Sequence, residues 1–282
     1  MTLSKGLLDL RPLRTSPAFR RLWGSSLLGA LGGQIAVVAV LFQVWDMTRN
    51  PFWTGAIGIA NAVPLIVFGM VGGTLADAVD RRTLVRWATA GQALAGLGLA
   101  AQAALGIQSL WLVLGLVSAQ GAASAVGAPA RRTFIPRLLG PDQVGAGIAL
   151  QMLTFQGSML IGPALGGLII GRWGVSASYL AFASMVVLSL YGIVRLPSMP
   201  PEGAGTRPGW RSTVAGFSYV VQRPVLRGSF ASDLAATLLA MPVALFPLVN
   251  EVRFGGDPET LGLFLTCIAI GGISAGVFSG LV

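Results

Sequence analysis

The chain lacks most of the side chains that enzymes use for chemistry. Its 282 residues include no histidine, one lysine (Lys5) and one cysteine (Cys267). The absence of histidine excludes histidine-based acid–base catalysis, and with a single cysteine it also excludes Cys/His metal sites and an intrachain disulfide. Charged residues are scarce as well, at 10% of the chain, where an ordinary soluble domain is about a quarter charged.

Apolar residues are abundant instead, at 54% of the chain with a mean hydropathy of +0.75. A helix needs about 20 apolar residues to cross the hydrocarbon core of a bilayer. Six stretches of 22–29 residues carry no charge or a single acid, and the 44 uncharged residues 87–130 are long enough for two spans. The sequence therefore predicts an all-α membrane protein with eight spans.

The basic residues are unevenly distributed between the loops. With the N-terminus inside, 16 of the 19 Lys and Arg residues fall on the cytoplasmic side, and only Arg49, Arg172 and Arg253 fall outside. Cytoplasmic loops of membrane proteins carry such an excess. This distribution predicts a cytoplasmic N-terminus, and it explains the net charge of +9 without a nucleic-acid partner.

The sixth span is followed by a segment that divides the chain. Residues 197–208 are rich in proline and glycine and are not expected to be helical. After them Trp210, Val214 and Phe217 recur at helical spacing beside Arg211, which predicts a short helix on the cytoplasmic surface. We expect a six-helix bundle in residues 1–196, a cytoplasmic linker in 197–227, and the first two helices of a second bundle in 228–282.

The second part weakly repeats the first. An offset of 207 residues places Gly55 on Gly262 and Gly73 on Gly280, and it pairs the first two spans with the last two. Since transporter repeats close in whole units, about 121 residues and four spans would be missing. We expect a truncated or partial chain; the alternative is a complete protein with eight spans.

The segment between the second and third spans carries a family motif, GGTLADAVDRR at residues 72–82. It resembles the G-x-L-a-D-r-x-G-r-r loop of the major facilitator superfamily, with Asp80 at the second glycine position, as in the branch of enterobactin-exporter-like and multidrug efflux proteins. The resemblance implies the fold of that superfamily, no cofactor, and a cytoplasmic gate formed with the end of the fourth span. The gate residues would be Gly73, Asp77, Asp80, Arg81, Arg82, Arg131 and Arg132.

A second motif lies in the fifth span. Residues 162–167 (GPALGG) look like the G-P-x-x-G-G signature associated with antiporters, through Gly162, Pro163, Gly166 and Gly167. Proline removes a backbone hydrogen bond and glycine lets helices approach closely, so a bend and a close crossing are expected there. An ordinary seam of small residues is the alternative interpretation.

The usual proton-coupling motif of the family is incomplete. Gln120 and Gly121 are present in the fourth span, but Val117 stands where members often have arginine. Asp233 is the only ionisable side chain inside a predicted span, so it is the candidate for proton coupling. Alternatively, it is an acid in the first turns of a helix, or it pairs with Arg227.

Substrate is expected near the midplane between the two halves. The polar side chains far from span ends are the candidates for binding it: Gln34, Asn61, Gln151 and Gln156. Each could instead bond a neighbouring helix. We also expect bends at Met241–Pro242 and Phe246–Pro247 in the seventh span.

These features favour a secondary exporter of the bacterial inner membrane over an enzyme. Its partners would be the lipid bilayer, protons and a small amphipathic solute such as a drug or siderophore, and we expect a monomer. The chain has no phosphate-binding loop for ATP. A non-transporting fragment and a permease subunit of an ATP-driven system remain alternatives.

The orientation can be tested by labelling. A cysteine at residue 81 or 131 should react with a membrane-impermeant maleimide only after the inner membrane is opened, because both positions are predicted to be cytoplasmic. The measurement is labelling of intact and permeabilised cells. Reaction at either position in intact cells would contradict the orientation.

Overall fold

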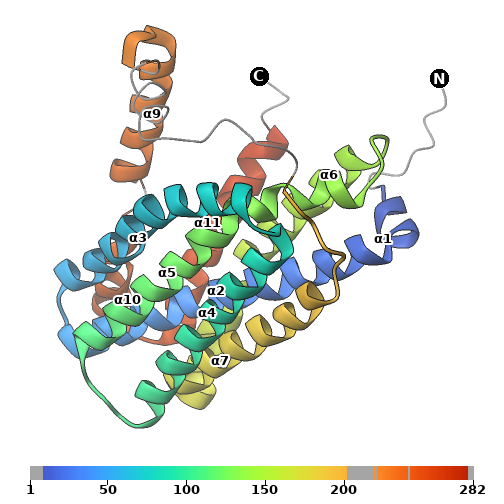
Figure 1. Cartoon of the computed structure of the whole chain (residues 1–282). Helices are drawn as coiled ribbons and strands as arrows, with labels where there is room; N and C mark the ends of the chain where they lie inside the picture. The colour runs from blue at the N-terminus through green and yellow to red at the C-terminus, as the bar shows by residue number, and fades with distance from the viewer. Residues whose placement is uncertain (1–8, 202–218, 220, 241, 279–282) are drawn as a thin grey trace.

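The computed structural model describes residues 9–201, 219, 221–240 and 242–278, and the elements it assigns there are helices. The first part of the chain holds α1 (Arg11–Thr15), α2 (Pro17–Thr48), α3 (Pro51–Ala78), α4 (Arg81–Ala104), α5 (Leu110–Arg132), α6 (Phe134–Leu138) and α7 (Val144–Val194) (Figure 1). The later part holds α9 (Pro224–Ala240), the 3-10 turn η1 (Val243–Leu245), α10 (Phe246–Phe254) and α11 (Pro258–Phe278). Of the surface helix predicted after Trp210, residues 210–218 and 220 lie outside the described residues, whereas residues 219, 221 and 222 are helical.

Short polar residues set where the long helices begin. The side chains of Ser16, Asn50, Asp80 and Ser109 accept hydrogen bonds from backbone N–H groups in the first turns of α2, α3, α4 and α5. Such a cap is worth about 1 kcal/mol. Ser16 and Asn50 each precede a proline, which fits the first helical turn because it has no N–H to satisfy. The loops between the spans are therefore short.

Five helices are long and apolar enough to cross a membrane: α2, α3, α5, α7 and residues Pro258–Ala275 of α11. Two predicted spans meet inside the 51 residues of α7, where Gly174 has a φ of 82° that breaks the helix. Helix α4, the predicted third span, is 24 residues long but is not among the five. It begins with arginines and carries two glutamines in its interior, which make it less apolar than its neighbours.

The predicted seventh span is interrupted in the structure. Helix α9 ends at Ala240, and Pro242 and the turn η1 separate it from α10. Pro247 stands in the first turn of α10, where a proline is tolerated. The interruption therefore falls at the two prolines where bends were expected.

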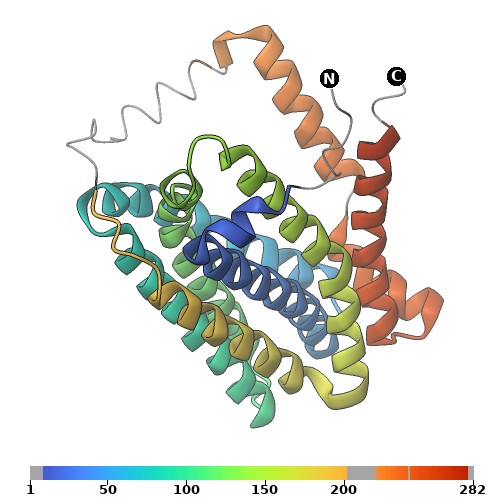
Figure 2. The ribbon, with the colours of Figure 1, turned by 90° about the vertical axis from the view of Figure 1, so that its right-hand side faces the viewer.

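Helix α2 lies in the middle of the bundle (Figure 2). It packs along α7; α3 packs on α5, and α4 packs on both α5 and α7. After the linker, α11 packs along α7, whereas α9 stands apart from the bundle (Figures 1 and 2). We call the end with α1, α6 and the α3–α4 loop the basic end. The opposite end carries the α2–α3 corner and Gly174.

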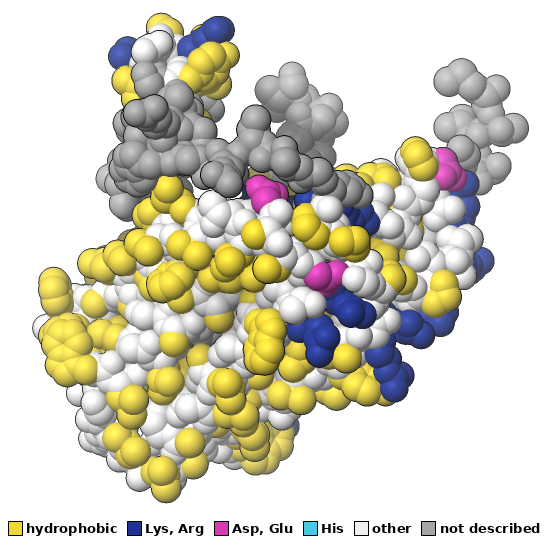
Figure 3. Space-filling view, viewed as in Figure 1, with side chains coloured by type: hydrophobic (Ala, Val, Ile, Leu, Met, Phe, Trp, Pro, Cys, Tyr) yellow, Lys and Arg dark blue, Asp and Glu magenta, His cyan; other side chains and the backbone are white. Residues whose placement is uncertain are grey.

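The bundle has apolar side chains both inside and outside. Phe19, Phe134 and Leu150 are fully or almost fully buried at the basic end, and Leu99 and Tyr179 are fully buried toward the opposite end. The outer surface is also apolar: Figure 3 shows hydrophobic side chains over much of one face, with the basic side chains gathered toward the basic end. An apolar exterior is what lipid requires, because hydrocarbon cannot hydrogen-bond polar groups.

Close helix contacts occur at what we call the glycine seam: Gly162, Gly166 and Gly167 of α7 with Gly262 of α11. A Cβ on Gly166 would lie 3.2 Å from Ile35 Cα of α2. A Cβ on Gly167 would lie 2.5 Å from the Pro258 carbonyl oxygen of α11. The 162–167 motif thus faces a helix of the first bundle on one side and a helix that follows the linker on the other. The helical dihedrals continue through Pro163, so the break in α7 lies at Gly174 instead.

A pair of glycines on α11 tests the importance of this packing. An added methyl at Gly262 would collide with the Pro163 carbonyl oxygen and lie 3.2 Å from Gly167 Cα, whereas Gly271 has open space. We expect Gly262→Ala to lower the free energy of unfolding by about 1–3 kcal/mol. Gly271→Ala should raise it by about 0.5–1 kcal/mol, because alanine favours helix. Denaturant titration in detergent micelles measures both, and equal effects would contradict the close contact.

Candidate functional site

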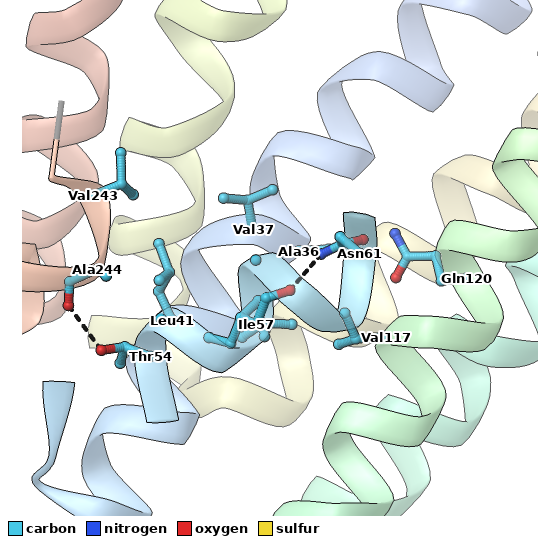
Figure 4. A pocket seen from close by; sticks show the side chains of 13 residues that line it. Ala36, Val37, Leu41, Thr54, Ile57, Asn61, Val117, Gln120, Val243 and Ala244 are labelled. Carbon is cyan, nitrogen blue, oxygen red and sulfur yellow. Dashed lines mark hydrogen bonds between the residues drawn. The ribbon is translucent and has the colours of Figure 1, made fainter. Parts of the chain in front are cut away.

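Three neighbouring cavities follow the first bundle from one end to the other. The opposite-end cavity has a volume of about 260 Å³ between α2, α3, α5 and η1. Its wall is mostly apolar, with Thr54 at one end and the amides of Asn61 and Gln120 near each other at the other (Figure 4). The Thr54 hydroxyl donates to the Ala244 carbonyl over 2.7 Å, which ties α3 to η1.

The middle cavity, of about 270 Å³, shares Asn61 and Gln120 with the first. It shares Gly29, Gln92 and Ser124 with the third. The three cavities are therefore adjacent to one another, and their walls combine polar and apolar side chains.

The basic-end cavity is the largest of the three, at about 570 Å³ between α2, α4, α5, α6 and α7. Its polar lining combines hydroxyl groups, amides and two guanidinium groups: Ser25, Ser26, Thr89, Gln92, Ser124, Arg131, Arg132, Gln151 and Ser189. The apolar lining includes Phe155, Val186 and Ile193. Such a surface suits a solute that is polar on one side and apolar on the other.

The structure brings two of the four predicted substrate residues to these cavities. Asn61 lines the opposite-end and middle cavities, and Gln151 lines the basic-end cavity. Gln34 and Gln156 are half-buried and line none of the three, and the Gln34 stem packs against Gly162.

Sequence reasoning missed Gln92 as a lining residue and treated Gln120 only as part of a motif. Both lie in the interior of a predicted span, which is the criterion that selected Asn61 and Gln151. Their position inside a span was therefore a usable signal, but it did not distinguish amides that line a cavity from amides that do not. What separates lining from non-lining amides is the direction in which each helix face points, and that depends on packing.

Another pair of amides is used for structure. Gln43 of α2 and Gln102 of α4 donate to each other at 3.1 and 3.0 Å, and the buried Tyr179 hydroxyl donates to Gln43 Oε1 over 2.8 Å. Gln102 also donates to the Leu99 carbonyl. The network joins α2, α4 and α7, and its two amide groups hydrogen-bond to each other.

Asp80, one of the predicted gate residues, binds the segment that follows α7. Its carboxylate accepts hydrogen bonds from the Thr83 N–H at 2.8 Å, the Ser198 hydroxyl at 2.6 Å and the Met199 N–H at 2.7 Å. Burial alone would raise the pKa of Asp80, but these hydrogen bonds outweigh it and lower the pKa to about 2.

The two arginines after Asp80 reach the same region. The Arg82 guanidinium donates to the Leu196 carbonyl over 2.8 Å, and the Arg81 N–H donates to the Met199 carbonyl over 3.0 Å. The α3–α4 loop therefore holds residues 196–199 against the basic end.

The other predicted gate residues are not paired with one another. Arg131 donates to the Thr89 hydroxyl, Arg132 is exposed at the cavity rim, and Asp77 is exposed. Within the described part of the chain, no ion pair joins either acid of the loop to Arg131 or Arg132. A gate made by these residues stays a prediction.

The two glycines of the loop motif, Gly72 and Gly73, have different surroundings. A Cβ on Gly72 would lie 2.6 Å from the Val126 carbonyl oxygen of α5, whereas Gly73 has open space. The close approach of α3 to α5 therefore depends on Gly72, although the motif drew attention to Gly73.

At the opposite end, Glu251 joins the two parts of the chain. Its carboxylate accepts from the Trp45 indole N–H at 2.5 Å and from Arg49 at 2.6 Å, and Arg49 also pairs with Asp46 at 2.8 Å. The Arg49, Asp46 and Glu251 side chains are about half exposed, so solvent screens both ion pairs, whereas the Trp45 side chain is buried. The sequence gives no local signal for a contact between residues 202 positions apart.

Asp233, the predicted coupling acid, lies exposed on α9 and lines none of the three cavities. Among the described residues it forms no ion pair with Arg227. Its role in coupling stays a prediction.

Known proteins resemble this chain along almost its whole length. The sequence profile of the transmembrane secretion effector family matches residues 8–281. The enterobactin exporters EntS of Shigella boydii serotype 18 and of Citrobacter koseri are each 26% identical over 280 residues, which is 99% of this chain and 67% of theirs. These relatives are transporters, not enzymes.

Solved structures show a similar fold. Two crystal structures of POT family transporters, in complex with a thioalcohol-conjugated peptide and with 5-aminolevulinic acid, each give a TM-score of 0.56 at 12% identity. They cover 83% and 84% of this chain, which spans 51% and 53% of their length. The likeness supports the all-α transporter fold.

The binding role of Asp80 can be tested with isosteric variants. We expect Asp80→Asn to speed amide exchange at residues 198–199 and to lower the free energy of unfolding by about 1 kcal/mol, because the bonds from Ser198 and Met199 lose their charge. Asp77→Asn, which changes an exposed acid of the same motif, should alter neither the amide exchange nor the free energy of unfolding. Hydrogen–deuterium exchange and denaturant titration measure these effects.

The same contact predicts a pH dependence. Because the pKa of Asp80 is lowered from 3.8 to about 2, its stabilising effect is complete above pH 3.8 and is lost as the pH falls toward 2. Asp80→Asn should lack this part of the acid response. An identical response in both proteins would show that the carboxylate does not hold the segment.

Proposed function

The chain belongs to the transmembrane secretion effector family of the major facilitator superfamily, and on that premise we propose that it exports small amphipathic compounds in exchange for protons. The basic end would face the cytoplasm of a bacterial cell, and the bundle would span the inner membrane. Because the chain spans about two thirds of the length of its curated relatives, transport is proposed for the protein that contains these residues.

The series of cavities is the observation that supports this proposal most directly. Hydroxyl and amide groups line three adjacent cavities in a bundle whose exterior is apolar, and apolar side chains share the same walls. Buried polar groups are costly in a membrane unless they are paired or meet a solute or water. A mixed lining favours an amphipathic cargo over a sugar phosphate.

The relatives suggest one class of cargo. Both curated relatives cited above export enterobactin, so a siderophore is a reasonable first candidate for this chain as well. Drugs of similar amphipathic character are the alternative. The walls of the three cavities contain no Asp or Glu, so none of them favours a cationic cargo by charge.

The contacts between the two parts of the chain suit alternating access. In transporters of this type one bundle rocks against the other around the bound solute. The bonds from Trp45 and Arg49 to Glu251 connect the two parts at the opposite end, and they would have to break when that end opens. The ion pair of Arg49 with Glu251 is exposed to solvent and is therefore weak enough to exchange during transport.

Proton coupling is assigned to Asp233. An acid that enters the membrane during the cycle is expensive to keep charged there, which suits a group that gains and loses a proton. In this structure Asp233 lies exposed on α9, apart from the bundle. Val117 stands where members of the superfamily often have an arginine, so proton coupling in this chain needs another ionisable group. Asp233 is the only acid inside a predicted span.

The transport proposal is tested in everted membrane vesicles. The chain should move a fluorescent efflux substrate when a pH gradient is imposed, and Asp233→Asn should abolish the dependence on that gradient by removing the titrating group. Asp142→Asn, at an exposed loop acid, is the matched control and should export normally.

Each alternative gives a different result in the same vesicles. Absence of transport by the 282-residue chain would favour a non-transporting fragment. Transport that requires ATP and a copurifying ATPase would favour a permease subunit. Unchanged pH dependence of transport in Asp233→Asn would show that this acid does not carry the proton and has a structural role.

A further inference from the structure

The basic-end cavity contains a cation without an anionic partner. Arg131 lies in the last turn of α5, where its half-buried side chain borders the cavity. Its one hydrogen bond to a described residue is to the Thr89 hydroxyl, at 2.5 Å. No Asp or Glu lines the cavity, and no salt bridge of the described residues includes Arg131.

A guanidinium that faces the interior of a helix bundle normally has more partners than this. The group carries five N–H donors in a planar fork, and buried charges in proteins are usually paired with an opposite charge. The negative end of the α5 dipole favours a cation at this position, but it does not occupy the donors that face the cavity. The arrangement leaves donors free to bind something that enters the cavity.

The rest of the cavity wall indicates what could enter. Hydroxyl groups of Ser25, Ser124 and Ser189 and the amide of Gln151 can donate to oxygen atoms. Phe155 and Val186 provide apolar surface in the same space. The volume of about 570 Å³ is in the range of pockets for small organic molecules.

We propose that the basic-end cavity binds an amphipathic organic carboxylate through the Arg131 guanidinium. A carboxylate matches the guanidinium fork with two parallel hydrogen bonds, and its single negative charge matches the one cation that the wall partly buries. A phosphate monoester would bring a second charge, and the other guanidinium of the wall, that of Arg132, is exposed to solvent. The inference deepens the proposed export and rests on it, because it gives the cargo a charge and a chemical class.

This site is distinct from a site between the two halves. Every element that lines it, from α2 to α7, precedes the linker. Because the first bundle supplies the whole wall, the carboxylate would bind without a contribution from the later helices. Binding can therefore be measured on the purified chain without a transport assay.

The test compares two probes of the same shape, one anionic and one neutral. We would titrate 2-naphthoate and its neutral isostere 2-naphthamide into the purified chain in phosphatidylcholine nanodiscs, by isothermal titration calorimetry. Arg131→Gln should weaken naphthoate binding about 10-fold or more, since a charge-assisted pair is lost, and should leave naphthamide binding unchanged. Arg20→Gln, at an exposed arginine of the same end, should change neither.

A second variant guards against misfolding. Arg131→Lys keeps the charge but loses the planar fork, so naphthoate should bind more weakly than to the wild-type chain and more tightly than to Arg131→Gln. Equal losses for both probes, no loss in Arg131→Gln, or the same loss in Arg20→Gln would each overturn the proposal.

A last comparison tests whether the cavity binds a free carboxylate or the phosphate of a lipid headgroup. Replacing part of the phosphatidylcholine by phosphatidylglycerol should leave naphthoate binding unchanged. Displacement of naphthoate by the anionic lipid would assign the cavity to a lipid headgroup and overturn the proposal. Binding without export in vesicles would contradict only the proposed function, whereas export without Arg131-dependent binding would contradict only this inference.

Discussion

Close contact between helix backbones at the glycine seam is the constraint on which the rest of this structure depends. In a bilayer, lipid tails are as apolar as the side chains, so helices associate through packing and hydrogen bonds instead of hydrophobic burial. Gly166 brings α7 onto α2, and Gly167 with Gly262 brings α11 onto α7. One helix thereby contacts the centre of the first bundle and a helix that follows the linker.

The polar interactions are arranged around that packing. The paired amides of Gln43 and Gln102 connect α2 to α4 in the half of the bundle away from the basic end, where their donors and acceptors satisfy one another. In the cavities the polar groups have fewer partners, and they face space that a solute or water can fill. The same residue types thus give rigidity in one place and binding capacity in another. The two ends also differ, since Asp80 holds the segment after α7 at one end and Glu251 joins the two parts at the other.

Much of this architecture could be predicted from the positions of charges and turns. The uncharged stretches predicted the helices of the first bundle, and the two prolines at 242 and 247 predicted where the seventh span is interrupted. The all-α transporter fold followed from the residue 72–82 motif and agrees with the relatives. Each of these features depends on residues that are close together in the sequence, so it can be recognised from a single amino-acid sequence.

The site was less predictable because it depends on contacts between distant residues. The motif marked Asp80 as important, but its bonds to Ser198 and Met199 depend on where residues 196–199 return after α7. Gln34 and Gln92 look equivalent in sequence, yet Gln34 packs on Gly162 while Gln92 lines two cavities. The distribution of charge placed Arg131 at the predicted cytoplasmic side without indicating that it would line a cavity.

The contact between α7 and α11 can be measured most directly with a disulfide. A Cβ on Gly171 would lie 3.2 Å from Glu259 Cγ, so cysteines at these two positions should be within bonding distance. In a Cys267→Ser background, Gly171→Cys with Glu259→Cys should form a disulfide rapidly in native membranes under mild oxidation, while Gly157→Cys with Glu259→Cys should not. Failure of the first pair to cross-link, with both cysteines accessible to alkylation, would contradict the packing of the later helices on the first bundle.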